Sequence, residues 1–369
     1  MKKSLFALAA LGAFAGSAQA QSSVTLYGVA DATVGFTSNL AKPGGGSGNT
    51  FSVGSGGLSG SRWGLRGVEE ISSDLSAIFA LENGFSLDTG TMSQGGRLFG
   101  RQAFGGLQSK TAGSLTFGRQ YTTMFDALAN FSPGAYAGLY EPTFALLGLD
   151  LRSDNTVKYK GTFGPWTVGA HWSFGNGVAG GGEVPGQFRR DTGYGAGVTY
   201  LAGPFGATVA YDQANPSVIN GTTFLGTGSV KKAAVAGSYT VGPAKLMAGY
   251  RYGQAKDQSG RAVVRDNMYW VGANYQVTAA LGLTVDYFYQ DFRPVTAGGI
   301  TTNPANPWQV MFIADYNLSK RTDVYLTTAY SKYAGLTLDT ASINFANGYP
   351  LGGTKTNMLG VALGVRHKF

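Results

Sequence analysis

The sequence has no cysteine, only two histidines, and few charged residues, which make up 13% of the chain. Without cysteine the chain has no disulfide framework, no thiol nucleophile and no cysteine metal site. Neither histidine has a recognisable triad context and no metal-ligand cluster is evident, so the sequence predicts no catalytic, metal or cofactor site. The sequence leaves open only whether an acidic pair in a loop binds a calcium ion.

Long apolar runs are absent as well. After residue 20 no stretch of about 18 apolar residues occurs, which excludes a transmembrane helix. A membrane protein without helical spans must be a closed barrel, because every backbone polar group has to be paired inside the bilayer. The formal net charge of +8 does not predict a nucleic-acid partner, because the Lys and Arg residues are scattered and form no run.

The first 20 residues have the pattern of a secretory signal peptide. Lys2 and Lys3 form a basic start, residues 5–14 an apolar run, and Ala18-Gln-Ala20 a cleavage site. The sequence therefore predicts export, followed by a single domain over residues 21–369 without a linker.

Glycine and aromatic residues are abundant, with 58 Gly, 20 Tyr and 22 Phe. Glycine permits strong twist and tight packing of strands, and aromatic residues build the interfacial girdles of membrane barrels. The chain also ends in a stretch with the period of a β-strand. One face of this stretch carries Val361, Leu363, Val365, His367 and Phe369, and the other face carries Ala362, Gly364, Arg366 and Lys368.

Apolar stripes of the same period recur about sixteen times, for example over residues 24–36, 205–211 and 283–289. Many of them end in Tyr, Phe or Trp, where a membrane interface would lie. Short turns alternate with long connections such as residues 37–60 and 121–154. The pattern predicts an all-β fold, a 16-stranded antiparallel transmembrane β-barrel. The strands of a soluble lectin-like sandwich would also alternate apolar and polar side chains. The aromatic residues at the ends of the stripes, the alternating loop lengths and the terminal Phe favour the barrel.

Several blocks resemble the trimeric general porins of β-proteobacteria, and together they span the chain from residue 23 onwards. They include Ser23-Val-Thr-Leu-Tyr-Gly-Val-Ala-Asp31, Ser61-Arg-Trp-Gly-Leu-Arg-Gly-Val-Glu-Glu70, Phe99-Gly-Arg-Gln-Ala-Phe-Gly105, Leu115-Thr-Phe-Gly-Arg-Gln-Tyr121 and Gly364-Val-Arg-His-Lys-Phe369. Each block is short, but their order and spacing are specific.

The resemblance implies a homotrimer in the Gram-negative outer membrane, in contact with lipid and lipopolysaccharide. It implies that the barrel-assembly machinery recognises the terminal strand with Val361, Leu363, Val365, His367 and Phe369. It also implies a third long loop, about residues 121–154, folded into the lumen as a constriction. The apolar side chains of this segment, such as Phe125, Phe131 and Tyr140, favour the lumen over the barrel rim or a neighbouring subunit.

Charged side chains at the narrowest point set the selectivity of a wide pore. Strand alternation predicts an inward-facing basic wall, and the loop supplies the opposing acids. The basic residues are Arg62, Arg66, Arg97, Arg101, Arg152 and Lys158, and the acidic ones are Asp126, Glu141 and Asp150. The resemblance suggests that Arg62, Arg101 and Arg152 lie at the constriction, while the orientation of Arg119 stays undecided.

These features predict a general porin, a passive diffusion channel for ions and small hydrophilic solutes that prefers anions. The alternative is a substrate-specific outer-membrane channel for organic anions or sugars, which would differ only in the detail of the constriction. A structural or adhesive barrel is disfavoured because the predicted lumen is lined by Ser, Thr, Gly, Lys and Arg rather than by bulky apolar groups.

Overall fold

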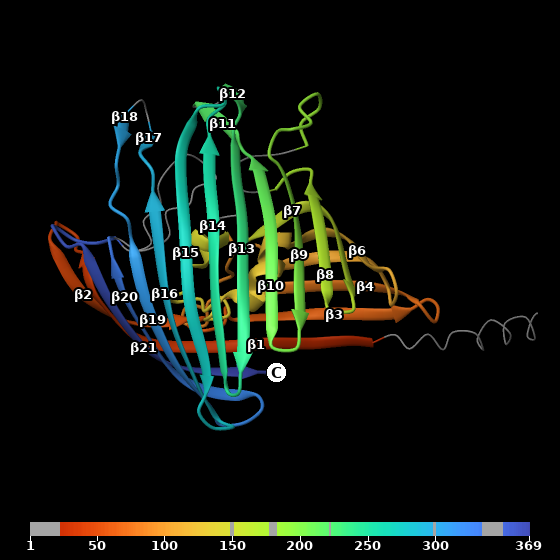
Figure 1. Cartoon of the computed structure of the whole chain (residues 1–369), viewed down its shortest axis with the longest axis horizontal. Coiled ribbons are helices and arrows are strands. Elements are labelled where there is room, and N and C mark those ends of the chain that lie inside the picture. The colour runs from red at the N-terminus through yellow and green to blue at the C-terminus, as the bar shows by residue number, and fades with distance from the viewer. Residues whose placement is uncertain (1–22, 148–150, 177–182, 221–222, 298–299, 334–349) are drawn as a thin grey trace, which may run out of the picture.

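A computed structural model describes residues 23–147, 151–176, 183–220, 223–297, 300–333 and 350–369 (Figure 1). The predicted signal peptide, residues 1–20, and Asp150 lie outside the described residues. Long strands dominate the structure and curve around a set of short helices (Figure 1). No helix in the described part of the chain is long and apolar enough to cross a membrane.

The first half of the chain forms nine antiparallel strands in one sheet. They are β1 (Ser23–Ala41), β2 (Ser47–Ser55), β3 (Arg62–Glu70), β4 (Leu75–Gly84), β5 (Gln102–Ser109), β6 (Gly113–Tyr121), β7 (Arg152–Phe163), β8 (Trp166–Ser173) and β9 (Thr192–Ala202). Between β6 and β7 lie α2 (Thr123–Leu128), the 3-10 helix η1 (Ala129–Phe131) and α3 (Thr143–Leu147).

The second half continues the same sheet. Its strands are β10 (Phe205–Asn215), β13 (Ser229–Val241), β14 (Ala244–Lys256), β15 (Ala262–Gln276), β16 (Leu281–Phe292), β19 (Trp308–Asn317), β20 (Thr322–Lys332) and β21 (Asn357–Lys368). Two small hairpins lie in the connections, β11 (Ser217–Asn220) with β12 (Thr223–Thr227), and β17 (Val295–Ala297) with β18 (Ile300–Thr302).

The sheet closes where β21, the last strand, pairs with β1, the first. The other edge of β1 is shared by β2 and β3, which pair with its two halves. These two strands occupy one place in the ring, so the closed barrel has sixteen positions. At the seam, the backbone N–H of Gly28 donates to the Phe369 carbonyl at 3.0 Å and the Phe369 N–H donates back to Gly28 at 3.1 Å. Closure leaves no free sheet edge at the seam.

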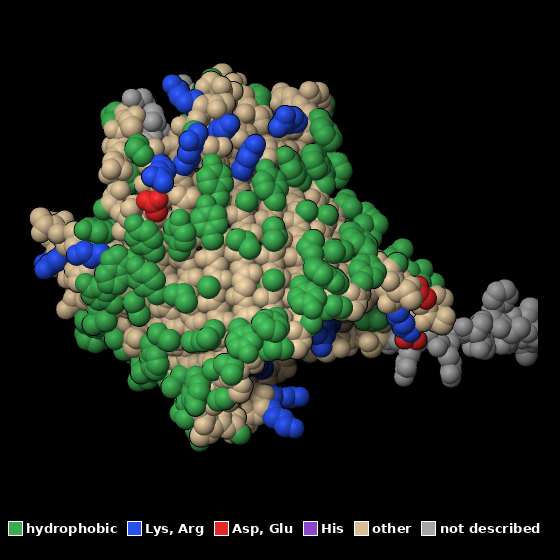
Figure 2. All heavy atoms as spheres, viewed as in Figure 1, with side chains coloured by type: hydrophobic (Ala, Val, Ile, Leu, Met, Phe, Trp, Pro, Cys, Tyr) green, Lys and Arg blue, Asp and Glu red, His purple; other side chains and the backbone are tan. Residues whose placement is uncertain are grey.

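The two faces of the strands separate as the alternation predicts. In β1, Val24, Leu26 and Val34 are exposed, whereas Asp31 and Thr33 between them are buried. In β21, Leu363 and Val365 are exposed and Ala362 is buried. Figure 2 shows apolar side chains spread over the outer surface of the barrel. An apolar exterior around a polar interior is the arrangement of a barrel in lipid.

Connections at one end of the barrel have two to four residues, as between β7 and β8 or between β9 and β10. At the other end most are long, but the predicted long link over residues 37–60 is wrong. Residues 37–60 contain β2 and a tight turn at residues 42–46, in which three consecutive glycines have positive φ. The connection between β14 and β15 at this end is short as well, with only residues 257–261. Loop length therefore alternates less strictly than the sequence indicates.

The described parts of the segment between β6 and β7, residues 122–147 and 151, pack against strands from another part of the ring. The segment's buried Met124, Leu128 and Phe131 form one apolar cluster with Met268 and Trp270 of β15, together with Phe288 of β16. The neighbours of these β15 side chains, Tyr269 and Val271, are exposed. The cluster therefore lies on the face of β15 opposite the exposed one.

Candidate pore constriction

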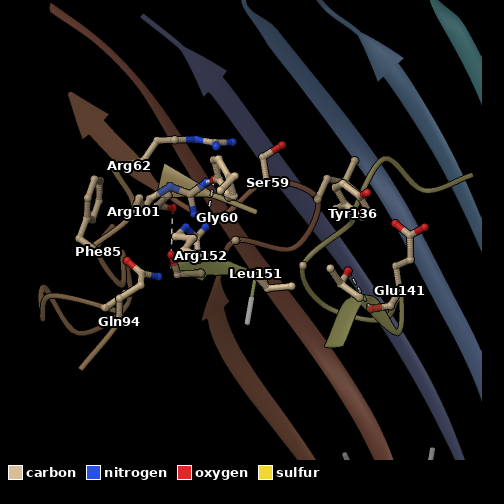
Figure 3. Close-up of a pocket in the computed structure, with 18 of the residues that line it drawn as sticks. Ser59, Gly60, Arg62, Phe85, Gln94, Arg101, Tyr136, Glu141, Leu151 and Arg152 are labelled. Atoms are coloured by element: carbon tan, nitrogen blue, oxygen red, sulfur yellow. Dashed lines mark hydrogen bonds between the residues drawn. The ribbon is translucent and has the colours of Figure 1, made fainter. Parts of the chain in front are cut away.

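Three arginines from different parts of the barrel wall meet at one cavity of about 360 Å³. Arg62 begins β3, Arg101 immediately precedes β5, and Arg152 begins β7. Figure 3 shows their side chains close together on one side of the cavity, with Tyr136 and Glu141 on the other. The structure thus brings together the three arginines that the family resemblance placed at a constriction.

Arg101 is held by a buried carboxylate. Its Nε lies 2.7 Å from Oε1 of Glu82, and its Nη2 donates to the Tyr121 hydroxyl at 2.7 Å. The Tyr27 hydroxyl donates to the second oxygen of Glu82 at 2.9 Å. Glu82 therefore offsets the charge of Arg101 and fixes the direction of its guanidinium group.

Among the described residues, Arg152 and Arg62 lack an ion pair of the kind that Arg101 forms with Glu82. Arg152 Nη2 donates to the Tyr121 hydroxyl at 3.0 Å, and its guanidinium carbon lies 4.5 Å from the centre of that ring, a cation–π contact. Tyr121 in turn stacks on Phe125, with ring centres 4.0 Å apart. Within the described residues no carboxylate forms an ion pair with Arg62 or Arg152. The cavity wall therefore carries an excess of positive charge.

Glu141 faces the arginines across the cavity, but it also holds its own segment together. Its carboxylate accepts hydrogen bonds from the Ser132 hydroxyl and from the backbone N–H groups of Gly134 (3.3 Å) and Ala137 (2.8 Å). Burial raises the pKa of Glu141 from 4.5 to about 6, although these hydrogen bonds favour the ionised form. Glu141 is thus the acid of this cavity whose charge changes near neutral pH.

Lowering the pH from 7 to 5 should strengthen the preference for anions. Protonation of Glu141 removes the negative charge opposite the arginines, and we expect the anion-to-cation permeability ratio to rise about two-fold. Because the pKa of Glu141 is higher in the folded protein than in the unfolded chain, Glu141 also stabilises the fold by ~2 kcal/mol below pH 4.5. This stabilisation is lost as the pH rises through 6. Reversal potentials at both pH values measure the effect. The Glu141→Gln variant should show no such change, and an equal change in that variant would contradict this role.

The predicted acid Asp126 and base Lys158 pair with each other away from the arginines. Lys158 Nζ lies 2.7 Å from Asp126 Oδ2, and Lys160 Nζ lies 3.6 Å from the same oxygen. Asp126 and Lys160 line a second, smaller space between α2 and strands β7 to β9. Asp126 therefore compensates two lysines rather than opposing Arg62, Arg101 and Arg152.

Arg66 and Arg97 lie outside the cavity lining. Arg66 is exposed, and its guanidinium carbon lies 5.5 Å from the centre of the Tyr27 ring. The strand predicted to carry Arg97 begins only at Gln102, because the preceding connection turns through glycines with positive φ, so alternation does not apply to Arg97. Its Nη1 lies 2.7 Å from Asp154.

Arg119 belongs to the same ion-pair group as Arg97. A bulge between Gly118 and Gln120 breaks the register of β6 with β7, which explains why alternation could not orient Arg119. Its Nη1 lies 2.5 Å from Asp154, and its Nε donates to the Gly100 carbonyl at 2.7 Å. Asp154 is therefore shared between two arginines.

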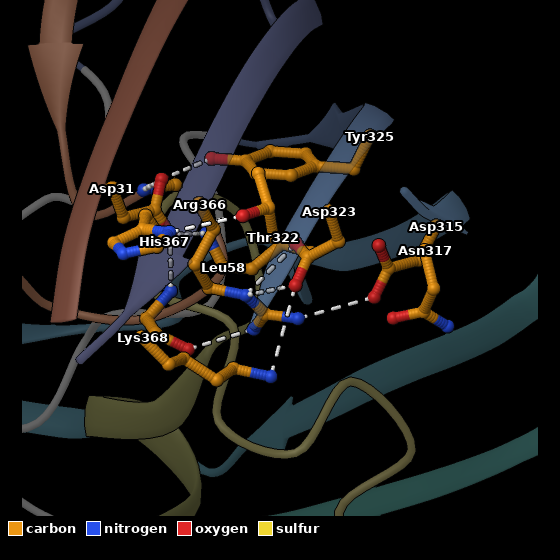
Figure 4. Close-up of polar contacts among 12 residues, drawn as sticks. Asp31, Leu58, Asp315, Asn317, Thr322, Asp323, Tyr325, Arg366, His367 and Lys368 are labelled. Carbon is orange, nitrogen blue, oxygen red and sulfur yellow. Dashed lines mark hydrogen bonds and ion pairs between the residues drawn. The ribbon is translucent and has the colours of Figure 1, made fainter. Parts of the chain in front are cut away.

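One wall of the cavity is a strap, residues 56–61, that joins β2 to β3. The fully buried Asp31 accepts hydrogen bonds from the backbone N–H groups of Gly57 (3.2 Å), Leu58 (3.0 Å) and Ser59 (2.7 Å), and from the Tyr325 hydroxyl. Figure 4 shows Asp31 and Tyr325 facing each other beside Leu58. Nothing in the sequence identified residues 57–59 as partners of Asp31.

Arg366 holds the strap from the other side. Its Nη1 donates to the Ser59 hydroxyl at 2.8 Å, while its Nε lies 3.0 Å from Asp323 and its Nη2 lies 3.1 Å from Asp315 (Figure 4). The strap then supports the segment between β6 and β7, because the Leu139 N–H donates to the Gly57 carbonyl at 3.0 Å. Asp31 and Arg366 are therefore positioning residues for the cavity wall.

Side chains from distant strands hold the same segment by its backbone. Trp270 Nε1 donates to the Phe131 carbonyl at 2.8 Å, and Asn274 Nδ2 donates to the Pro133 carbonyl at 2.9 Å. Gln309 and Arg251 donate to the carbonyls of Tyr140 and Ala145. The segment is thus held along its length by β14, β15 and β19.

Replacing Trp270 with Phe should loosen this segment without unfolding the barrel. The variant keeps most of the apolar ring but removes the donor to Phe131, at a cost of about 1 kcal/mol, and leaves a buried carbonyl unpaired. We expect larger open-channel current fluctuations in single-channel recordings. Trp166→Phe on the exposed surface is the control, and equal noise in both variants would contradict the anchoring role.

A closed barrel with an apolar exterior and a basic internal cavity defines a membrane channel. The family model for the Gram-negative porin matches residues 7–336. An outer membrane porin protein of Bordetella pertussis is 31% identical, and outer membrane porin protein 32 of Delftia acidovorans is 30% identical, each over 100% of both chains. The chain belongs to the Gram-negative porin family, which consists of passive channels of the outer membrane rather than enzymes.

Solved structures agree on the fold. An anion-selective porin from Comamonas acidovorans superposes with a TM-score of 0.77 at 24% identity, over 94% of this chain and 100% of that one. A trimer form of OmpT from Vibrio cholerae gives a TM-score of 0.67 at 19% identity, over 94% of this chain and 99% of that one. At these identities the likeness concerns the fold.

Proposed function

We propose that this porin is a general diffusion channel that prefers anions. The observation that carries the preference is the charge of the cavity, where Arg62 and Arg152 have no acidic partner among the described residues and Glu141 is the opposing acid. Arg101 is balanced by Glu82. An anion that passes this wall exchanges part of its hydration for guanidinium donors, whereas a cation is repelled.

We also propose that the third long loop, about residues 121–154, lies in the lumen and forms the constriction. Two observations support this location. The apolar residues of the segment pack on the unexposed faces of β15 and β16, and its residues 135, 136 and 141 line the cavity opposite β3 and β7. A segment that bridges opposite walls narrows the path and brings solutes within reach of the arginines.

The proposal also covers the export of the chain and its assembly in the membrane. Residues 1–20 would be removed as a signal peptide, and residues 21–369 would form one barrel that assembles as a homotrimer. The barrel-assembly machinery would recognise the terminal strand, whose Leu363, Val365 and Phe369 are exposed on the outer face. Outer-membrane phospholipid and lipopolysaccharide would surround the trimer. In support, a trimer form is known for OmpT, which has a similar fold.

Liposome swelling tests the channel function. Vesicles that contain the protein should swell with small sugars at rates that fall steeply with solute size, and with a small anion faster than with a cation of equal size. A rate that saturates for one solute would instead favour a substrate-specific channel for organic anions or sugars. Equal rates for anion and cation would contradict the preference.

A further inference from the structure

A column of aromatic rings runs along the cavity and begins at one of its arginines. The guanidinium group of Arg152 lies over the Tyr121 ring, which stacks on Phe125 with 4.0 Å between ring centres and 13° between ring planes. The ring centre of Phe125 in turn lies 4.6 Å from that of Tyr136. All four residues line the cavity. We call Tyr121, Phe125 and Tyr136 the aromatic column.

The rings of this column are not simply part of the apolar core. Phe131 of the same segment is fully buried in its cluster, whereas Phe125 and Tyr136 border that cluster and stay half-buried at the cavity. Figure 3 shows Tyr136 across the cavity from the arginines and Phe85, another lining residue, on the side of Arg101. Aromatic rings therefore face the cavity from both sides.

The backbone holds Tyr136 at the cavity in a conformation that bulky residues seldom adopt. The φ angle is 54° at Ala135 and 62° at Tyr136, in the left-handed region. Two hydrogen bonds fix this arrangement. The Tyr136 N–H donates to the Ser132 hydroxyl at 3.0 Å, and the Tyr136 hydroxyl donates to the Phe125 carbonyl at 2.9 Å. Backbone strain of this kind is concentrated at ligand sites, where the surrounding contacts enforce it.

The arginine side of the cavity offers donors for an anionic group. The Nε atoms of Arg62 and Arg152 are buried, and neither has a hydrogen-bond partner among the described residues. A buried N–H without a partner is unfavourable, so the site favours a solute that supplies acceptor oxygens. A carboxylate has two such oxygens and matches the guanidinium fork. The cavity volume of about 360 Å³ lies within the roughly 300–1,000 Å³ of small-molecule sites.

We propose that this cavity binds aromatic carboxylates as they pass, with the carboxylate on Arg62 and Arg152 and the ring against the aromatic column. This inference rests on the anion preference proposed above and adds a class of anion to it. The side of a stacked column presents ring edges, and aromatic pairs favour edge-to-face contact. A saturated ring of similar size has no π face to offer. The site retains aromatic anions without excluding other solutes, so the channel stays general for small sugars.

Block of the chloride current through single wild-type channels in a planar bilayer at pH 7 tests the proposal. Benzoate should reduce the current saturably. Cyclohexanecarboxylate has the same charge and a similar size, and its half-blocking concentration should be about five-fold higher. If apolar burial alone held the ring, the saturated acid would block at least as well. This comparison does not depend on the folding of any variant.

Two variants separate the column from aromatic residues elsewhere in the barrel. Phe125→Leu/Tyr136→Leu removes two rings of the column and should lower the ratio of the two half-blocking concentrations below about two. Phe205→Leu/Tyr239→Leu removes an exposed Phe–Tyr pair with ring centres 5.1 Å apart, and should keep the five-fold ratio. The ratio is taken within each variant, so a change in its channel current does not affect the comparison.

The Arg62→Gln/Arg152→Gln variant should weaken block by both acids to the same extent, because it removes the carboxylate site and leaves the rings. Equal block by both acids in the wild type, or the same fall of the ratio in Phe205→Leu/Tyr239→Leu, would overturn the aromatic site and leave the anion preference intact. The reversal potential of the same wild-type channels distinguishes the two proposals, because a cation-selective potential would overturn both.

Discussion

An Arg62→Gln/Arg152→Gln variant should lose its preference for anions. Among the described residues, these two guanidinium groups are the cations of the cavity without an ion pair, and their removal leaves Glu141 facing an Arg101 that Glu82 already offsets. At separations of a few ångströms in a wet pore, each charge contributes on the order of 1 kcal/mol, so the anion-to-cation permeability ratio should fall about ten-fold or more. Reversal potentials under a salt gradient measure this ratio.

Arg97→Gln is the matched control for that variant. Arg97 carries the same charge, but it lies outside the cavity lining and pairs with Asp154 at 2.7 Å. Its replacement should change the permeability ratio by less than about two-fold, because a paired, half-exposed cation is screened. A loss of selectivity in Arg97→Gln as large as that in the double variant would show that the overall charge of the barrel, not the cavity, sets the preference.

An Asp31→Asn variant should form a much less heat-resistant barrel. Asparagine keeps the shape of the side chain but offers one acceptor oxygen in place of two, so donors among Gly57, Leu58, Ser59 and Tyr325 lose their partner in a buried site. Breaking such a buried network costs about 3–5 kcal/mol. The temperature at which the folded form disappears in semi-native gel electrophoresis measures the loss.

Two variants control this result. Asp74→Asn alters a partly exposed aspartate in a short turn, which accepts from the Ser109 hydroxyl at 2.7 Å, and should cost less than about 1 kcal/mol. Tyr325→Phe removes a single donor to Asp31 and leaves no backbone N–H unpaired, so it should fold and lose about 1 kcal/mol. If Asp31→Asn is as heat-resistant as Asp74→Asn, the strap does not depend on Asp31.

The alternation of the sequence was enough to predict the fold, because each strand lies between lipid and a polar interior and both surroundings select side chains with period 2. The exposed Leu26 and Leu363 and the buried Asp31 follow this rule. It fails where the backbone leaves the regular ladder. Arg97 lies in a glycine-rich connection, and Arg119 lies at a bulge, so neither could be oriented from its neighbours.

The lining of the cavity could not be predicted from the strand alternation alone. The residues Arg62, Arg101 and Arg152 could be named from strand parity and the family resemblance, but their common cavity depends on the curvature of the barrel. Contacts between distant residues could not be predicted, such as those of Asp31 with residues 57–59 or of Trp270 with Phe131. No local pattern encodes which backbone groups a buried carboxylate or indole will meet.

The reversal potential of the wild-type channel in a planar bilayer under a tenfold potassium chloride gradient tests the proposed selectivity most directly. The unpaired Arg62 and Arg152 predict a zero-current potential of the sign set by chloride, larger at pH 5 than at pH 7. A potential of the sign set by potassium at both pH values would contradict it.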